Sequence, residues 1–173
     1  ALGGSARFVA KNSVEIVCKN IFSSEIPLEA MSARQAVLFI GGALARTGHV
    51  KIYPPRGDEL GKRPINRHLE GIRALGGVIN DSNNRMEIFM PQRSNPVEYT
   101  FEKNTHCGTE NMILASVFNK GKVVLKNAAE EPEVDNLILC LNNMGARIQR
   151  LQPRTIEIVG VDPRNIPGCA STR

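Results

Sequence analysis

The chain of 173 residues lacks tryptophan and has only two tyrosines, so few aromatic side chains are available for stacking on nucleic-acid bases. No apolar run approaches the ~18 residues that a membrane-spanning helix needs, and no signal peptide opens the sequence. A phosphate-binding P-loop, a G-x-S-x-G element and a metal-ligand cluster are also missing, so we expect no metal and no cofactor. With 42% hydrophobic and 23% charged residues, the composition is typical of a soluble globular protein.

The cysteines are few and scattered. There are four of them, with no C-x-x-C pair and no histidine at zinc-finger spacing: Cys18, Cys107, Cys140 and Cys169. This distribution favours thiols in a reducing cytoplasm over disulfides, and we expect a cytoplasmic protein. The net charge of +5 suits an anionic partner such as a phosphate, a nucleotide or a nucleic acid. Alternatively, the chain is a fragment, and the missing half of the protein balances its positive charge.

One phrase occurs three times along the chain. It reads Ala1-Leu2-Gly3-Gly4, then Ala74-Leu75-Gly76-Gly77, then Asn143-Met144-Gly145-Ala146. Each copy leads through a polar stretch into an apolar strand with a central glutamate, which is Glu15, Glu87 or Glu157. A period of about 70 residues indicates a repeated supersecondary unit. The first copy begins at Ala1, so we expect the chain to be part of a larger protein.

Apolar spacing predicts the same elements in each unit. The predicted helices are 31–46, which ends at Gly48, and 65–75, 109–118 and 134–144; the predicted strands are 50–53, 77–79, 85–90, 122–125 and two within 146–159. The order is β-α-β-α-β-β. We predict an α+β fold in which the helices share an interior and the sheets lie outside. The units are 1–25 (the terminal strand pair of a truncated first repeat), 26–92, 93–162 and a tail at 163–173.

Three segments carry a resemblance to a known family. They are Lys126-Asn127-Ala128-Ala129-Glu130-Glu131-Pro132-Glu133, Gly61-Lys62-Arg63-Pro64-Ile65-Asn66-Arg67-His68, and Met31 to Gly48. In one register over nearly the whole chain, the sequence resembles the UDP-N-acetylglucosamine enolpyruvyl transferases, and it is less similar to the enolpyruvylshikimate phosphate synthases. The resemblance implies an incomplete inside-out α/β barrel domain, with a second domain of the same protein as its missing partner.

The resemblance also implies a function. Members of this family transfer the enolpyruvyl group of phosphoenolpyruvate to UDP-N-acetylglucosamine. This reaction is the first committed step of peptidoglycan synthesis, on which cell-wall biogenesis, cell shape, the cell cycle and cell division depend. Because the family's base and further basic residues lie outside this chain, we expect the fragment alone to be inactive.

Arginines are the first candidate binding residues. A planar guanidinium holds a phosphate or carboxylate with two parallel hydrogen bonds, and Arg63 stands at the base of a loop, 54–64, where the family binds phosphoenolpyruvate. Pro64, Ile65, Asn66 and Arg67 match the family's nucleotide-contacting segment, with Asn66 in place of the usual aspartate. Arg34 falls in the first turn of the predicted helix, where the family has a nucleotide-binding arginine.

Asp58 occupies the position at which most family members carry a cysteine. That cysteine donates a proton to the methylene carbon of phosphoenolpyruvate and is alkylated by fosfomycin. A carboxyl group can donate the proton when a closed site raises its pKa, but it cannot form the thioether. We therefore expect a fosfomycin-insensitive enzyme. A solvated loop aspartate is the alternative.

A second segment, Asn104, Thr105, His106, Cys107 and Gly108, precedes the predicted helix 109–118 and matches the family segment that cradles the uridine and phosphate groups. A His106–Cys107 nucleophile pair is disfavoured, since neighbours in an extended segment point opposite ways. Glu130, Glu131 and Glu133 suit a helix start or turn better than an acid–base pair. Glu15, Glu87 and Glu157 predict a solvated outer sheet face.

Two rival functions stay open. Similar repeats occur in RNA terminal phosphate cyclases, and the chain is basic, so a non-catalytic module that binds RNA or another polyanion is one alternative; the shortage of aromatic residues weighs against it. The other is a carboxyvinyl transferase that acts on shikimate phosphate. A membrane partner is not expected.

Overall fold

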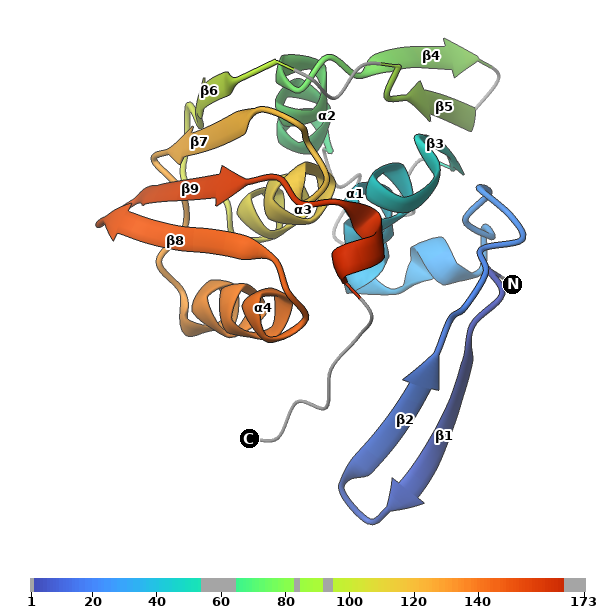
Figure 1. The fold of residues 1–173 in the computed structure, drawn as a ribbon. Coiled ribbons are helices and arrows are strands. Elements are labelled where there is room, and N and C mark those ends of the chain that lie inside the picture. Colours follow the sequence, from blue (N-terminus) through green and yellow to red (C-terminus); the bar gives the residue numbers. More distant parts are fainter. Residues whose placement is uncertain (1, 54–64, 83–84, 92–94, 167–173) are drawn as a thin grey trace.

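The computed structural model describes residues 2–53, 65–82, 85–91 and 95–166, and for Ser32 and Arg34 it describes the backbone alone. Figure 1 shows the arrangement of its elements. The strands are β1 (Ser5–Ala10), β2 (Ser13–Val17), β3 (His49–Ile52), β4 (Val78–Ser82), β5 (Arg85–Phe89), β6 (Val97–Thr100), β7 (Lys122–Lys126), β8 (Arg147–Gln152) and β9 (Thr155–Val159). The α-helices are α1 (Leu38–Thr47), α2 (Asn66–Ala74), α3 (His106–Ser116) and α4 (Pro132–Asn143), and the 3-10 segments are η1 (Ala30–Ser32), η2 (Arg34–Val37) and η3 (Pro163–Asn165).

The two larger sheets share one topology. The four-stranded sheet has the order β6-β7-β9-β8, in which only the β6–β7 pair is parallel. The three-stranded sheet has the order β3-β5-β4 and is antiparallel. Beside β3, Glu25 forms a parallel bridge with Lys51, and the Lys51 carbonyl accepts the Ile26 N–H at 2.9 Å. This bridge occupies the place that β6 has beside β7, so both sheets follow the predicted β-α-β-α-β-β order.

The three hairpins also share one register. The cross-strand partners Ala6–Ile16, Ile79–Ile88 and Ile148–Ile158 are equivalent in β1–β2, β4–β5 and β8–β9. The next pair along each hairpin contains the repeated glutamate, opposite Arg7, Asn80 or Gln149. Because shifting a strand by one residue moves its side chains to the other face, an identical register in three hairpins confirms the predicted internal repeat.

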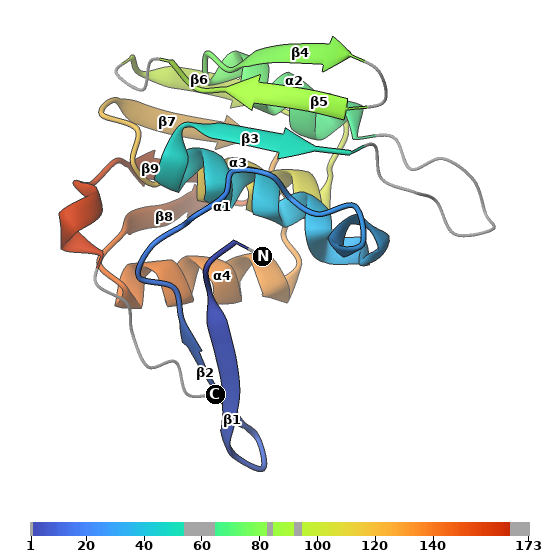
Figure 2. The same cartoon turned by 90° about the vertical axis from the view of Figure 1, so that its right-hand side faces the viewer.

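The helices α1 and α3 form the centre of the molecule, and the sheets lie outside them. Figure 2 shows α1 beneath the β3-β5-β4 sheet and α4 beneath β8. Eight of the 11 residues of α3 are buried, whereas α4 buries only Val134, Ile138 and Leu141, which lie on one face. The predicted shared helical interior is therefore confirmed for α1 and α3, while α4 keeps an exposed side.

Two predicted helix starts are wrong. The helix predicted from Met31 begins at Leu38, and the residues before it form two short 3-10 segments that the extended Ala33 (φ −72°, ψ 136°) separates. Its end is as predicted, since Gly48 adopts the left-handed conformation (φ 73°) and donates its N–H to the Leu44 carbonyl. The helix predicted from Thr109 begins at His106, because the Thr105 side chain caps it by accepting the Gly108 N–H.

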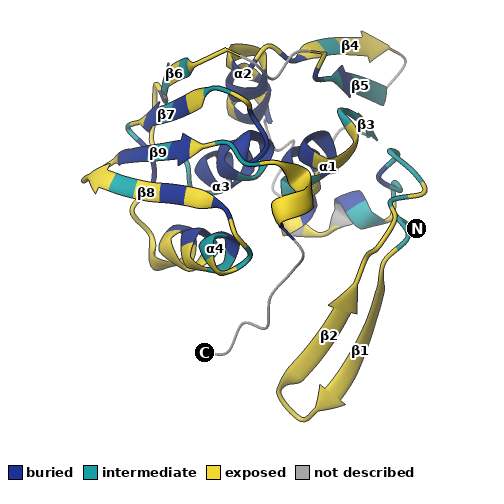
Figure 3. Cartoon of the chain, in the orientation of Figure 1, coloured by how far each residue is buried: buried dark blue, intermediate teal, exposed yellow. Residues whose placement is uncertain are grey.

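The hairpin β1–β2 projects from the rest of the molecule (Figure 3). All residues of both strands are exposed, including Phe8 (80%) and Ile16 (74%). The repeat equivalents of Ile16 are covered, since Ile88 and Ile158 are fully buried and their strands each pair with a third strand. No helix in the described part of the chain is long and apolar enough to cross a membrane.

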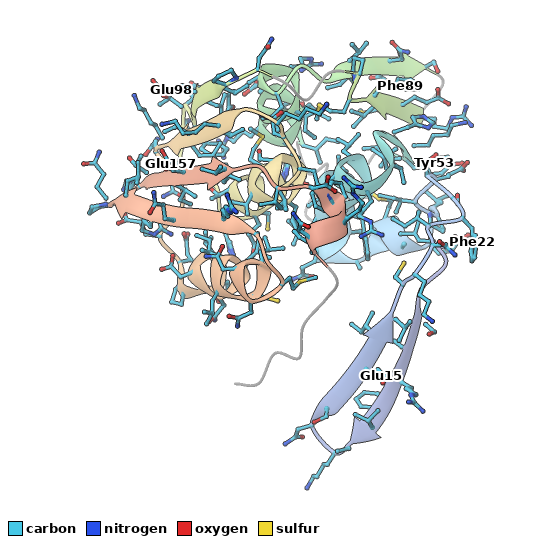
Figure 4. All side chains as sticks on the ribbon, viewed as in Figure 1. Glu15, Phe22, Tyr53, Phe89, Glu98 and Glu157 are labelled. Atoms are coloured by element: carbon cyan, nitrogen blue, oxygen red, sulfur yellow. The ribbon has the colours of Figure 1, made fainter. Side chains whose placement is uncertain are left out.

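The repeated glutamates each meet a cation on the sheet surface. Glu15 and Glu157, both labelled in Figure 4, contact Arg7 at 2.6 Å and Lys122 at 3.1 Å. Glu87 lies 3.2 Å from Lys51, and this hydrogen bond lowers the pKa of Glu87. The predicted outer face is thus solvated at Glu15 and partly covered at Glu87 and Glu157, where ion pairs shield the carboxylates.

Candidate functional site

Each candidate binding segment that the structure describes lies at the start of a helix. The backbone of Arg34 is in η2, directly before α1, rather than in the first turn of an α-helix as predicted. Ile65, Asn66 and Arg67 begin α2, and Thr105 to Gly108 begin α3. Unpaired N–H groups and the helix dipole make such ends favourable for an anion.

The helices α1, α2 and α3 differ from α4 in the acidic residues of their first turns. The first turns of α1, α2 and α3 contain no acidic residue, whereas that of α4 contains Glu133 and Asp135. Glu131 is the N-cap residue of α4, and Glu130 forms a 2.8 Å ion pair with Arg154. Acidic side chains therefore offset the dipole of α4, while the starts of α2 and α3 keep their positive potential.

The start of α2 has no side-chain cap from its N-cap residue. Its N-cap residue, Ile65, is buried and has no side-chain acceptor to offer the first N–H groups. Asn66 and Arg67 are exposed beside those groups. A donor amide and a guanidinium beside the first backbone N–H groups of a helix can bind a phosphate or diphosphate.

The start of α3 is capped by Thr105 and is hydrogen-bonded to the segment between β7 and α4. Thr105 accepts the Gly108 N–H at 3.3 Å, and the Thr109 hydroxyl donates to the Thr105 carbonyl at 2.8 Å. The same Thr109 hydroxyl accepts the Ala129 N–H at 3.0 Å, which joins α3 to the segment between β7 and α4. Asn104 is exposed before the cap, so its side chain can reach a ligand.

His106 and Cys107 do not form a nucleophile pair. Both belong to the first turn of α3 rather than to an extended segment, and consecutive helical side chains diverge by about 100°. The His106 Nε2 atom lies 3.3 Å from the Glu110 carboxylate, one turn along the helix. His106 therefore faces Glu110. Cys18, Cys107 and Cys140 are thiols, as predicted, and Cys169 lies outside the described residues.

A buried amide that the sequence analysis missed connects the three helices. Asn111 of α3 accepts the Gly41 N–H of α1 at 2.6 Å through its Oδ1 atom. Its Nδ2 group donates to the Val37 carbonyl at 3.1 Å and meets the His68 Nδ1 atom of α2 at 3.1 Å. Every polar atom of this side chain is thus used within one turn or two of the three helix starts. The candidate segments at 34, 65–67 and 104–108 belong to one region for this reason.

Among the described residues of the motif at 61–68, His68 is the buried polar one. Gly41 and Val37 fix which end of the Asn111 amide is oxygen, so Nδ2 must donate to His68 and Nδ1 must accept. Burial lowers the pKa of His68 from 6.5 to about 4, because the charged ring loses its hydration. His68 is therefore neutral at pH 7, with its proton on Nε2, and it supports the start of α2 from the interior.

The remaining predicted residues cannot be placed. Asp58, Arg63 and Pro64 lie outside the described residues, and the side chain of Arg34 is not described. Their catalytic and binding roles stay predictions. Among the described residues, no group of three His, Cys, Asp or Glu side chains is arranged to hold a metal ion.

Comparison with known sequences gives one family. The family model described as EPSP synthase (3-phosphoshikimate 1-carboxyvinyltransferase) matches residues 1–170. A UDP-N-acetylglucosamine 1-carboxyvinyltransferase of Dichelobacter nodosus is 38% identical over 162 residues, which are 93% of this chain and 38% of that protein. The enzyme of the same name from Finegoldia magna is 36% identical over the same shares. The chain thus spans about 38% of the length of these curated relatives.

Comparison with solved structures gives the fold. The enolpyruvyl transferase NikO from Streptomyces tendae superimposes with a TM-score of 0.79 over 96% of this chain and 39% of that one, at 14% identity. An EPSP synthase from Acinetobacter baumannii superimposes with a TM-score of 0.67 over 92% of this chain and 36% of that one, at 17% identity. The predicted fold class, an incomplete domain of the enolpyruvyl transferase type, is confirmed.

Proposed function

The chain belongs to the EPSP synthase family, and from this membership we propose that it forms part of a carboxyvinyl transferase acting on UDP-N-acetylglucosamine. The observation that carries the proposal is the 38% identity over 93% of the chain to an enzyme with that name. The whole enzyme would move the enolpyruvyl group of phosphoenolpyruvate to the sugar hydroxyl and release phosphate. It would serve peptidoglycan synthesis in the cytoplasm.

The geometry of the helix starts supports an anionic substrate. UDP-N-acetylglucosamine carries a diphosphate, and the starts of α1, α2 and α3 lack acidic residues. Asn66 and Arg67 would contact the nucleotide at α2, with Arg34 on a neighbouring segment. Asn104 to Gly108 would line the uridine and phosphate groups, mainly through backbone N–H groups.

The proposed mechanism is addition followed by elimination. Asp58 would protonate the methylene carbon of phosphoenolpyruvate while the sugar oxygen adds to the neighbouring carbon. Loss of a proton from the resulting methyl group, with departure of phosphate, would then restore the double bond. Arg63 would hold phosphoenolpyruvate through two parallel hydrogen bonds. The missing second domain would supply the base toward the sugar hydroxyl.

Phosphate release by the whole protein tests the proposed function. With phosphoenolpyruvate present, we expect release when UDP-N-acetylglucosamine is added and none when shikimate 3-phosphate is added. The family model's description favours shikimate 3-phosphate as the second candidate acceptor. Phosphate release with shikimate 3-phosphate but not with UDP-N-acetylglucosamine would show that the proposed acceptor is wrong. The 173-residue chain should show no release with either acceptor, because it spans only part of its relatives.

Asp58 leads to a prediction about inhibition. We expect fosfomycin to leave the whole enzyme active after long incubation, because a carboxylate does not form the thioether adduct. The variant Asp58→Cys should be inactivated in a time-dependent manner, with one inhibitor bound per chain. The measurement is residual activity against incubation time, with mass spectrometry of the adduct. Stoichiometric inactivation of the enzyme that carries Asp58 would contradict the assignment.

A further inference from the structure

The Asn111 side chain is an unusual occupant of a helix–helix interface. It is 1% exposed among apolar neighbours, at a position where leucine, which has the same branching, would avoid the cost of burying an amide. That cost is offset because both polar atoms of the amide make hydrogen bonds, the oxygen with Gly41 and the nitrogen with Val37 and His68. A fully satisfied buried polar group favours one packing arrangement over near alternatives.

Two partners of Asn111 belong to the same segments as the candidate ligand contacts. Val37 ends η2, the segment that contains Arg34, and His68 follows Asn66 and Arg67 in the first turn of α2. The backbone N–H of His68 also donates to the Ile65 carbonyl at 3.0 Å, which connects the residue that carries the buried ring to the N-cap residue. Movement of His68 therefore moves the exposed part of this turn.

We propose that Asn111 is a positioning residue, which acts through His68 to hold the first turn of α2 in the place where it binds the sugar nucleotide. The inference rests on the proposed function for its ligand. Asn111 itself lies in the interior and does not touch substrate. A displacement of about 1 Å at a positioning element can cost up to about a hundredfold in efficiency, so loss of this amide should appear in substrate binding.

Three variants of the whole enzyme test the role of the pair. Asn111→Leu keeps the branching of the side chain and removes all three hydrogen bonds, and His68→Leu removes only the link to α2. His68→Asn keeps an acceptor close to where Nδ1 lies. We expect Asn111→Leu and His68→Leu to raise the KM for UDP-N-acetylglucosamine about tenfold, which corresponds to one weakened charge-assisted contact, with kcat nearly unchanged. His68→Asn should keep the KM close to the wild-type value.

Ser116→Ala is the matched control. Ser116 is a buried polar residue of the same helix, and its hydroxyl donates to the Met112 carbonyl at 2.7 Å, away from the helix starts. This variant should lower the melting temperature without changing the KM. If Ser116→Ala raises the KM as much as Asn111→Leu does, or if Asn111→Leu keeps the wild-type KM, the positioning role is wrong.

Hydrogen exchange separates the inference from the proposed function. In Asn111→Leu, the backbone N–H groups of residues 68 and 69 should exchange about tenfold faster than in the wild type, while those of α4 keep their rates. If α2 exchanges faster in Asn111→Leu and the wild-type enzyme shows no turnover, the positioning role is kept and the proposed function is rejected. Unchanged exchange at α2 overturns the positioning role whatever the activity.

Discussion

Replacing Gly41 with alanine is expected to lower the free energy of unfolding of the chain by about 3 kcal/mol, the upper part of the range for overpacked interiors. A β-carbon at Gly41 would meet the backbone carbonyl oxygen and the Oδ1 atom of Asn111. Neither atom can move away cheaply, because one belongs to the backbone of α3 and the other accepts the Gly41 N–H. The helices α1 and α3 would have to separate, and the buried amide would lose a partner.

Gly42 provides a control at the next position of the same helix. A β-carbon there would have no atom within 4 Å in the described structure. Gly42→Ala should therefore raise the free energy of unfolding by about 0.5 to 1 kcal/mol, through the better helix propensity of alanine. Urea unfolding of both variants, followed by circular dichroism, measures the difference. Equal effects of the two substitutions would mean that α1 and α3 are not in close contact.

The repeat could be predicted from the sequence because it depends on local signals. Glycines that end helices and a glutamate at the same strand position recur about every 70 residues, and they identify the hairpins without any long-range information. Gly48 is an example, since its left-handed conformation ends α1 one residue after the predicted last turn. A resemblance carried by residues 61–68 and 126–133 then pointed to the family.

The start of α1 could not be predicted in the same way. Met31, Ala36 and Val37 are buried like the residues of α1, so apolar spacing continues without a break through η1 and η2. Over so few residues, a period of 3.0 cannot be distinguished from one of 3.6. The extended conformation of Ala33 separates η1 from η2, and alanine gives no sequence signal for it. The position of Arg34 was therefore wrong by one element.

Asn111 was missed for a different reason. Its partners lie 43 to 74 positions away in the sequence, on two other helices, so no window of sequence contains the arrangement. The available signal was a run of polar residues, Thr109, Glu110 and Asn111, in a helix that is otherwise small and apolar. Such a run shows that polar groups are present but not which of them are buried. The candidate segments were predictable, and the amide that brings them together was not.

Acidification is expected to destabilise the chain through His68. The pKa of this residue is about 4 in the folded protein and about 6.5 when it is solvated, so the unfolded chain binds more protons between these values. The contribution of neutral His68 is thus fully present above pH 6.5 and is lost as the pH falls from 6.5 to 4. Integrated over this window, the free energy of unfolding falls by about 3 kcal/mol.

The variant His68→Asn should remove this part of the pH dependence. Asparagine offers an acceptor for the Asn111 amide but does not titrate. The free energy of unfolding of the variant should therefore change less between pH 7 and pH 4 than that of the wild type. The difference between the two chains, from urea unfolding at half-unit intervals, gives the folded and unfolded pKa values of His68. Parallel curves would mean that His68 is solvated, because a ring that keeps its hydration has the same pKa in both states. In that case the Asn111 amide would have no buried acceptor on α2, and the link between the start of α2 and the helical interior would be lost.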